Sequence, residues 1–276
     1  MGVFLKSDKF TTFTIGVTSG TVPRDSTRGF VNAVSFLITF KKCTHHSLLY
    51  FESEGIFMSK KALIVWGGWD GHEPFKVASI MEEMLIESGW KVDKSDTLES
   101  FSNEGELKTY DLIVPCWTMG EIKHEYVMNV LNAVESGVGI AGCHGGMCDA
   151  FRTSTNWQFM TGAQWVEHPG GGDVIYEVNI KKNSSSPIIS GIDDFTVKSE
   201  QYYIHIDPCV NVLATTQFPT VDGPHAANGQ VDVPVVFTKL WGKGRIFYSS
   251  LGHVASVFDI KEVREIMKNG LLWAAR

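Results

Sequence analysis

Residues 137–149, Gly-Val-Gly-Ile-Ala-Gly-Cys-His-Gly-Gly-Met-Cys-Asp, constrain the fold of this chain more than any other stretch. The small apolar residues 139–141 are typical of a central parallel strand that is covered on both faces. The next five, Gly142-Cys-His-Gly-Gly146, have the Gly-x-nucleophile-x-Gly form of a nucleophile elbow. Glycine is needed on both sides because the central residue is strained and other backbone passes too close for a Cβ atom. The segment therefore predicts a strand, a sharp turn and a helix.

The elbow can be aligned in two registers. In one, the central residue is His144, where serine or cysteine is usual. In the other, residues 141–145 place Cys143 at the centre. A third interpretation is a glycine-rich turn without chemistry, and the motif alone leaves the three open.

Strand and helix patterns alternate from Ala62 onward, which predicts an α/β fold: a doubly wound, mostly parallel sheet with helices on both faces. The expected strands before the elbow are 62–66, 91–93 and 110–114. One helix is expected from Pro74 to Gly89, a weaker one over 98–108, and a third before Gly137. The first helix carries an apolar stripe at helical spacing, formed by Val77, Ile80, Met81, Met84 and Leu85.

The second half of the chain is β-rich. Alternating patterns predict strands at 174–180, 202–206, 212–216, 233–241 and 244–249. Gly242-Lys243 is expected to form a hairpin turn between the last two, and 260–274 a closing helix. Because there is no internal repeat and no Pro/Ser-rich linker, residues 58–276 are predicted to be one domain.

Three loops, 67–73, 116–121 and 143–149, are expected to leave the carboxyl ends of parallel strands. In a doubly wound sheet, ligands bind at that edge. The loops contain histidine, tryptophan or carboxylate side chains, so we expect them to line one pocket. The alternative is that they are independent surface loops.

Residues 1–57 differ from the rest. They are rich in Ser, Thr and Phe, lack a helical period, and carry six Lys or Arg against four Asp or Glu. The apolar run 30–40 is too short and too polar to span a membrane. Met58-Ser-Lys-Lys61 then resembles the start of a bacterial cytosolic protein. Residues 1–57 are therefore predicted to be a poorly ordered extension, with a genuine accessory segment as the alternative.

Charge and cysteine content exclude several classes of protein. The net charge is −7 without a basic run, which argues against a nucleic-acid partner. The five cysteines lack C-x-x-C spacing, so neither a disulfide framework nor a thiolate zinc site is expected. Such cysteines are typical of a reducing compartment, so we expect a cytoplasmic protein. We also expect a homo-oligomer and no membrane partner.

Four further motifs and the elbow together resemble the ThuA-like (trehalose utilisation) family. They are Gly67-Gly-Trp-Asp-Gly-His72, the elbow, Glu167-His-Pro-Gly-Gly171, Ser199-Glu-Gln-Tyr-Tyr203 and Trp241-Gly-Lys-Gly-Arg-Ile-Phe-Tyr-Ser-Ser-Leu-Gly-His253. The resemblance covers residues 60–275 and leaves out residues 1–57. It implies a flavodoxin-like sheet similar to that of class I glutamine amidotransferases, and a role in the catabolism of disaccharides or their oxidised derivatives.

The resemblance also bears on the chemistry. The amidotransferase cysteine position falls on His144, and the His-Pro-Glu of an amidotransferase is missing. His253, its nearest counterpart, is followed by Val254-Ala255 where a carboxylate would be expected. Glutamine hydrolysis is therefore not expected.

The predicted catalytic residues are His144 and His253 as acid and base, with Glu200 orienting or binding. Hydrogen-bonding groups and flat indole rings suit a sugar. The predicted binding residues are Trp69, Asp70, His72, Trp117, Cys143, Gly145, Gly146, His168 and Tyr202.

A zinc or manganese ion is a further hypothesis, because imidazole and carboxylate suit either metal. Its ligands would come from His72, His168, His205 and His253, with Glu200 or Asp70. No H-x-x-x-H or H-x-H spacing supports the site.

Three functions remain open. The favoured one is an enzyme (hydrolase, lyase or isomerase) acting on a sugar or keto-sugar. The others are a non-catalytic sugar-binding or regulatory protein, and a cysteine hydrolase that uses Cys143.

Overall fold

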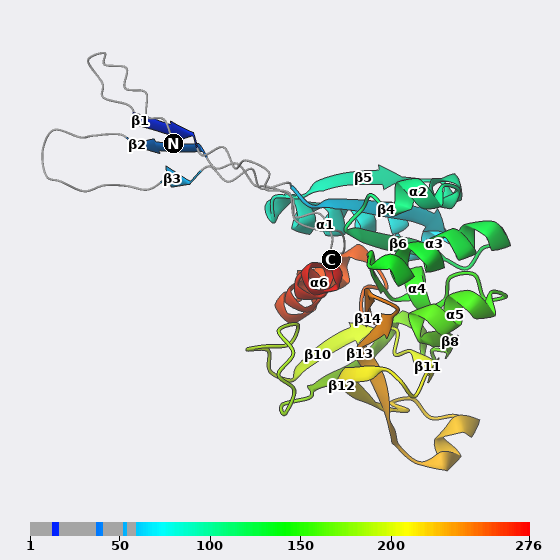
Figure 1. Ribbon diagram of the computed structural model, residues 1–276. Coiled ribbons are helices and arrows are strands. Elements are labelled where there is room, and N and C mark those ends of the chain that lie inside the picture. The colour runs from blue at the N-terminus through cyan, green and yellow to red at the C-terminus, as the bar shows by residue number, and fades with distance from the viewer. Residues whose placement is uncertain (1–12, 17–36, 41–51, 54–58) are drawn as a thin grey trace, which may run out of the picture. The chain divides into compact units, whose positions relative to one another are not determined.

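The structure, a computed structural model, describes residues 13–16, 37–40, 52–53 and 59–276 (Figure 1). The chain divides into two units, Met1–Met58 and Ser59–Arg276. In the first unit, the described residues form a sheet of order β1-β2-β3, with strands Phe13–Gly16, Leu37–Phe40 and Glu52–Ser53. Most of residues 1–57 are not among the described residues, so their predicted poor order stays a prediction.

A nine-stranded mixed sheet organises the second unit, in the order β10-β9-β12-β13-β14-β7-β6-β4-β5. Five neighbouring strands are parallel: β5 (Lys91–Ser95), β4 (Lys61–Gly68), β6 (Leu112–Thr118), β7 (Gly139–Cys143) and β14 (Gly244–Ser249). Antiparallel pairings then add β13 (Val231–Trp241), β12 (Asn211–Phe218), β9 (Val174–Ile180) and β10 (Phe195–Ser199). The mixed α/β architecture agrees with the sequence, and the sheet continues beyond its parallel part as an antiparallel extension.

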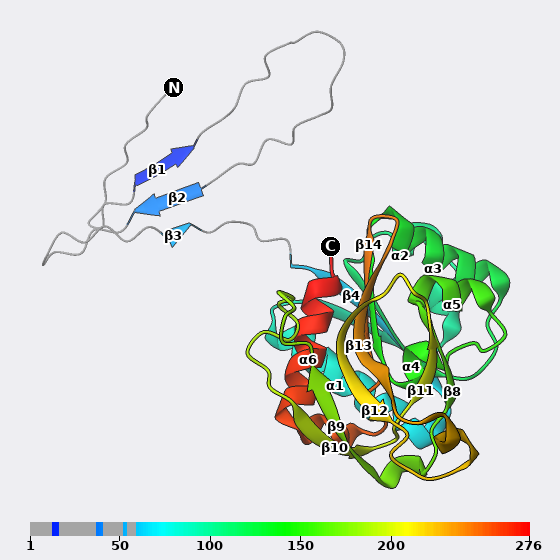
Figure 2. The same cartoon turned by 90° about the horizontal axis from the view of Figure 1, so that it is seen from below.

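Helices cover both faces of the parallel part (Figure 2). One face carries α1 (Pro74–Glu87) and α6 (Lys261–Ala274), which contact each other. The other carries α2 (Glu104–Leu107), α3 (His124–Ser136) and α5 (Thr155–Thr161). Side chains alternate across a strand, so Ile64 packs in the cluster of α1 and α6 while Leu63 packs in that of α3.

Local sequence signals explain the best-predicted elements. In α1, Val77, Met81, Met84 and Leu85 are buried, as their spacing predicts. The β13–β14 hairpin turns at Gly242, whose φ is +56°. A Cβ atom there would lie 2.6 Å from the carbonyl oxygen of Glu135, so a side chain at this position would clash with the end of α3.

Two expectations need correction. The helix expected over 98–108 is divided into a 3-10 helix, η2 (Leu98–Phe101), and α2, because Thr97 and Asn103 each cap a separate N-terminus. Strand β6 continues to Thr118, so the first half of the loop expected at 116–121 is strand.

The remaining elements lie around the carboxyl ends of the parallel strands. Strands β8 (Ala163–Glu167) and β11 (Tyr203–Ile206) form a separate two-stranded sheet. The short helices are η1 (Asp70–His72), α4 (Gly145–Cys148), η3 (Gly171–Asp173), η4 (Pro224–Asn228) and η5 (Ala255–Asp259).

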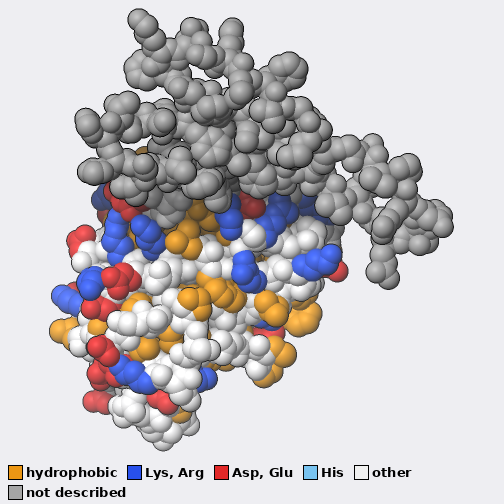
Figure 3. All heavy atoms as spheres, turned by 60° about the vertical axis from the view of Figure 1, so that its left-hand side comes forward, with side chains coloured by type: hydrophobic (Ala, Val, Ile, Leu, Met, Phe, Trp, Pro, Cys, Tyr) orange, Lys and Arg blue, Asp and Glu red, His pale blue; other side chains and the backbone are white. Residues whose placement is uncertain are grey.

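The surface carries charges of both signs. On the face in Figure 3, basic and acidic side chains occur together, with apolar side chains between them. Within the described part of the chain, no helix combines the length and the apolar character needed to cross a bilayer.

Candidate functional site

The elbow follows β7 as the sequence predicts, with His144 at its centre. The backbone of His144 has φ +50° and ψ −137°, and its N–H donates to the carbonyl oxygen of Ser249 at 2.7 Å. Few non-glycine residues adopt positive φ. A Cβ atom on Gly145 would lie 2.7 Å from Oγ1 of Thr118, and one on Gly146 would lie 3.0 Å from the Cα of Cys116. The two glycines therefore let α4 begin directly against β6.

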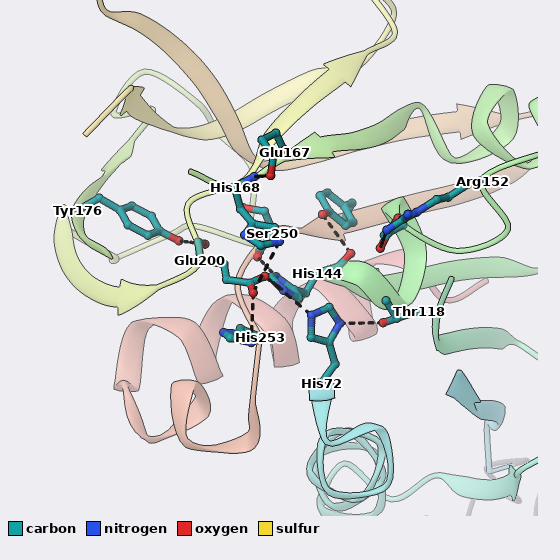
Figure 4. A network of polar contacts seen from close by, with 12 residues as sticks. His72, Thr118, His144, Arg152, Glu167, His168, Tyr176, Glu200, Ser250 and His253 are labelled. Atoms are coloured by element: carbon teal, nitrogen blue, oxygen red, sulfur yellow. Dashed lines mark hydrogen bonds and ion pairs between the residues drawn. The ribbon is translucent and has the colours of Figure 1, made fainter. Parts of the chain in front are cut away.

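Four histidines surround one carboxylate in the described part of the chain (Figure 4). The Nε2 atoms of His144 and His72 lie 3.0 and 3.8 Å from Oε2 of Glu200. Those of His253 and His168 lie 3.4 and 3.8 Å from its Oε1. The structure thus gathers the predicted acid/base residues around a single group.

These side chains come from separate elements that meet at the carboxyl edge of the sheet. His72 ends η1 behind β4, His144 follows β7, and His253 follows β14. Glu200 lies in the link from β10 of the large sheet to β11 of the small one, and His168 follows β8. Parallel strands present their carboxyl ends at one edge, which explains why the first three meet.

Hydrogen bonds from neighbouring groups fix the orientation of the two innermost rings. Nδ1 of His144 donates to the carbonyl oxygen of Ser250 at 2.8 Å, and Nδ1 of His72 lies 2.9 Å from the hydroxyl of Thr118. The ring of Tyr202 stacks on that of His144, with centroids 3.9 Å apart.

Sequence reasoning did not single out Ser250, or Thr118 within the loop expected at 116–121. It also missed Tyr176, whose hydroxyl donates to the carbonyl oxygen of Glu200 at 3.0 Å. The quoted family motif around residues 241–253 contains Ser250, but nothing in it identified the backbone carbonyl as a partner. The alternating pattern of β9 buries Tyr176 and could have marked it for the core, not for a hydrogen bond.

Exposure divides the cluster into a floor and a rim. The side chains of His144 and Glu200 are only 2% and 6% exposed, whereas those of His253 and His168 are 17% and 31% exposed. Trp69 is half exposed and packs edge-on against His72, with ring centroids 4.7 Å apart. A ligand that approaches from solvent therefore meets His253, His168 and Trp69 first.

Burial and the neighbouring rings shift the ionisation of the cluster. Burial lowers the pKa of His144 to about 4, against the opposing effect of Glu200. Burial also raises the pKa of the Glu200 carboxyl, but His144 and His72 outweigh it, and the net pKa is lowered. The pKa of His253 is lowered, mainly by burial. At neutral pH the site therefore contains an ionised carboxylate beside uncharged His144 and His253 rings.

The family model described as ThuA, trehalose utilisation, matches residues 61–274. The chain belongs to the ThuA family. No curated protein sequence matches it.

Solved structures of two ThuA-like proteins and of a third protein share the fold. A ThuA-like protein from Parabacteroides merdae has a TM-score of 0.62 at 18% identity, covering 78% of this chain and 90% of its own. One from Bacteroides uniformis has a TM-score of 0.60 at 17% identity, covering 78% and 91%. A Salmonella typhimurium protein described as cytoplasmic has a TM-score of 0.57 at 11% identity, covering 78% and 100%. At these identities the likeness concerns the fold alone.

In this ThuA-family chain, Cys143 does not have the surroundings of a nucleophile. Its side chain is buried beneath the elbow, and burial raises the pKa of its thiol to about 12. The thiolate is the reactive form of cysteine. The register centred on His144 therefore accounts for the site better than the one centred on Cys143.

Not every predicted residue joins the cluster. Asp70 is exposed in η1, and His205 is exposed on β11 with its ring beside Tyr203. Trp117 packs against Gly67 of β4 and against Gly120.

An ion pair that sequence reasoning missed lies behind the elbow. Buried Asp149, which follows α4, accepts two hydrogen bonds from Arg152, from Nε at 2.5 Å and from a terminal nitrogen at 2.9 Å. The guanidinium group of Arg152 in turn lies 4.5 Å from the ring centroid of Trp165. The pair therefore joins the end of the elbow helix to β8, the strand that leads to His168.

Proposed function

We propose that the chain is an enzyme of carbohydrate catabolism that acts on a disaccharide or keto-sugar by histidine acid/base chemistry, without glutamine amidotransferase activity. The observation that carries the proposal is the convergence of four imidazole Nε2 atoms on Glu200, with two of the rings partly open to solvent. Membership of a family named for trehalose utilisation supports a sugar as the ligand.

His253 is the proposed proton-transfer residue. It is partly exposed, and its lowered pKa leaves an uncharged ring that can accept a proton at neutral pH. On a keto-sugar, it would take the proton from the carbon beside the ketone. The resulting enolate is then either reprotonated or expels an oxygen substituent from the next carbon, which gives isomerase or lyase chemistry.

Glu200 and His144 are proposed to form the floor of the site, where Glu200 holds the surrounding rings in place. His168 and Trp69 are proposed to contact sugar hydroxyls and a ring face, respectively, because imidazole forms hydrogen bonds and indole offers a flat apolar surface. His72, at the end of η1, is proposed to support this floor.

The location of the site supports a finer proposal about the fold. The five parallel strands follow the order 2-1-3-4-5, which is the order of flavodoxin-like sheets. In such a sheet the strand order reverses between β4 and β6, and ligands bind at that switch point. His72 and Thr118 follow or end those two strands.

A cytoplasmic location is likewise proposed, because the cysteines in the described residues are free.

The test is turnover of trehalose, other disaccharides and their keto derivatives by the purified full chain, followed by NMR. His253→Gln should lower kcat by at least about 100-fold, the usual contribution of a general acid or base. The matched control is His205→Gln, because His205 is exposed and lies outside the cluster. Sugar binding without conversion would favour the regulatory alternative, and equal turnover by wild type and His253→Gln would remove His253 from the chemistry.

A further inference from the structure

The innermost contact of the site joins a ring nitrogen of His144 to a carboxylate oxygen of Glu200. A carbonyl oxygen only accepts hydrogen bonds, so the contact of His144 Nδ1 with Ser250 places a proton on Nδ1. A neutral ring then has only a lone pair at Nε2. Nε2 lies 3.0 Å from Oε2 of Glu200, so either a proton on Nε2 or a metal ion near both atoms satisfies this contact.

The second inner histidine repeats this arrangement. Nδ1 of His72 is held by Thr118, and its Nε2 is directed to the same carboxylate oxygen. Histidines that bind metals nearly always donate their other ring N–H to a carboxylate, a backbone carbonyl or water, as His144 does to Ser250, and this orients the free lone pair toward the metal. When the Thr118 hydroxyl accepts the hydrogen bond from Nδ1, the lone pair on Nε2 of His72 is available to a metal ion.

The spacing and burial of the three groups suit a metal ion. Their ligand atoms all lie within 4.8 Å of one another, and all three residues are buried. Ligands about 2.0–2.2 Å from a tetrahedral zinc ion lie roughly 3.4 Å apart, so small movements of these side chains are enough. Two imidazoles and one carboxylate form a ligand set typical of catalytic zinc, which keeps a further position open.

We propose that His72, His144 and Glu200 bind one divalent transition-metal ion, with zinc preferred, through their Nε2, Nε2 and Oε2 atoms. The set differs from the one expected from sequence, because His144 enters and His168, His205 and His253 do not. His253 and His168 lie near the other carboxylate oxygen, Oε1, and are not part of the proposed ligand set.

The proposal names a cofactor for the site of the proposed function, and only the role of the ion in sugar chemistry rests on that function. When bound, the ion would act as a Lewis acid toward a sugar carbonyl or hydroxyl oxygen. Because His253 is not one of the proposed ligands, it remains available to transfer the proton.

The experiment measures metal binding by the full chain without reference to turnover. Protein purified without an affinity tag is stripped with chelator, dialysed, and titrated with Zn²⁺ and then Mn²⁺ by calorimetry, and bound metal is counted by mass spectrometry. We expect about one Zn²⁺ per chain. Glu200→Gln and His72→Ala should each weaken binding at least tenfold, whereas His205→Ala should bind like wild type.

Thermal unfolding provides a second readout. A ligand that binds only the folded state raises Tm, so Zn²⁺ should stabilise wild type and His205→Ala but not Glu200→Gln. Absence of stoichiometric binding by wild type, or equal binding by Glu200→Gln, would overturn the proposal. Sugar turnover that persists in chelator would also reject a catalytic metal while leaving the proposed function intact. Metal binding without turnover of any sugar would support the metal site and contradict the proposed function.

Discussion

Nε2 of His144 lies 3.0 Å from Oε2 of Glu200, although the two residues are 56 positions apart in the chain. His144 is held by the elbow after β7, and Glu200 by the link between the two sheets. The contact therefore depends on two separate parts of the structure, the elbow after β7 and the link between the two sheets. Changes in either part should affect the site without touching the histidines themselves.

Gly145 is the elbow glycine next to the site, and a change there should affect the contact. A Cβ atom on Gly145 would lie 2.7 Å from Thr118 Oγ1 and 2.9 Å from His72 Cε1. Gly145→Ala should therefore displace His72 and destabilise the fold by about 1–3 kcal/mol, the usual effect of overpacking. Urea unfolding and ligand or metal binding measure the two effects.

Gly105→Ala is the matched control for this change. Gly105 is helical, and its added Cβ atom would meet only Asn103 Oδ1, at 3.3 Å. This substitution should leave binding unchanged and the free energy of unfolding within about 1 kcal/mol of wild type. If Gly145→Ala behaved in the same way, the close approach of α4 to β6 would not be needed for the site.

The ring of Tyr202 supports His144 from the side of the link. Because the two rings stack at 3.9 Å and Tyr202 is buried, Tyr202→Ala should remove this support and leave a cavity. The expected loss of stability is about 3–5 kcal/mol, as for other buried aromatic residues. Tyr202→Phe keeps the ring and should lose no more than about 1.5 kcal/mol. Equal effects in chemical denaturation would show that the hydroxyl, not the ring, is what matters.

The elbow was predictable from sequence because its signals are local. Glycines at fixed spacing after an apolar strand predict both the turn and the close packing of α4, and helical spacing likewise predicted the buried face of α1. Glu200 was found only through the family resemblance. It lies in an irregular link, where no periodic pattern marks a residue as central to a site.

Thr118 was missed for a physical reason. The apolar run of β6 reaches Val114 and meets Pro115, which usually ends a strand because it cannot donate a ladder hydrogen bond. In the structure, the pairing of β6 with β7 stops at Ile113, while the pairing with β4 continues to Thr118. The strand therefore tolerates proline where it has only one neighbour, and that tolerance depends on tertiary structure.

The rival cysteine chemistry predicts a different pH dependence of alkylation. With its pKa raised to about 12, only about one Cys143 side chain in 10,000 is a thiolate at pH 8, and this fraction grows tenfold per pH unit up to the pKa. Iodoacetamide at pH 8 should therefore label exposed Cys209 and spare Cys143 in peptide mass spectrometry. Rapid labelling of Cys143 at pH 8, prevented by a sugar, would restore the hydrolase hypothesis.

An ion pair away from the site offers a test of how the small sheet is attached. Lys239 Nζ on β13 lies 2.9 Å from Oδ2 of Asp207, which follows β11, and their side chains are 6% and 16% exposed. The Lys239 ammonium also donates to the carbonyl oxygen of Phe159 and lies 4.9 Å from the centroid of that ring. The pair thus joins β13 to both β11 and α5.

Asp207→Asn should destabilise the protein by about 3 kcal/mol at pH 7, because it leaves a buried ammonium without its counter-ion. A hydrogen bond from the N–H of Cys209, and then Lys239, lower the pKa of Asp207, so its folded state favours the carboxylate. Its contribution is complete above the ordinary carboxyl pKa near 4 and is lost as the pH falls through the lower, folded-state pKa. The difference between wild type and Asp207→Asn in urea unfolding should therefore shrink below pH 4.

Asp193→Asn, which removes an exposed partner of Lys182, should change stability by less than about 1 kcal/mol both at pH 7 and below pH 4. A deficit in Asp207→Asn that stays constant down to pH 2 would show that the charge of Asp207 is not what holds β11 to β13.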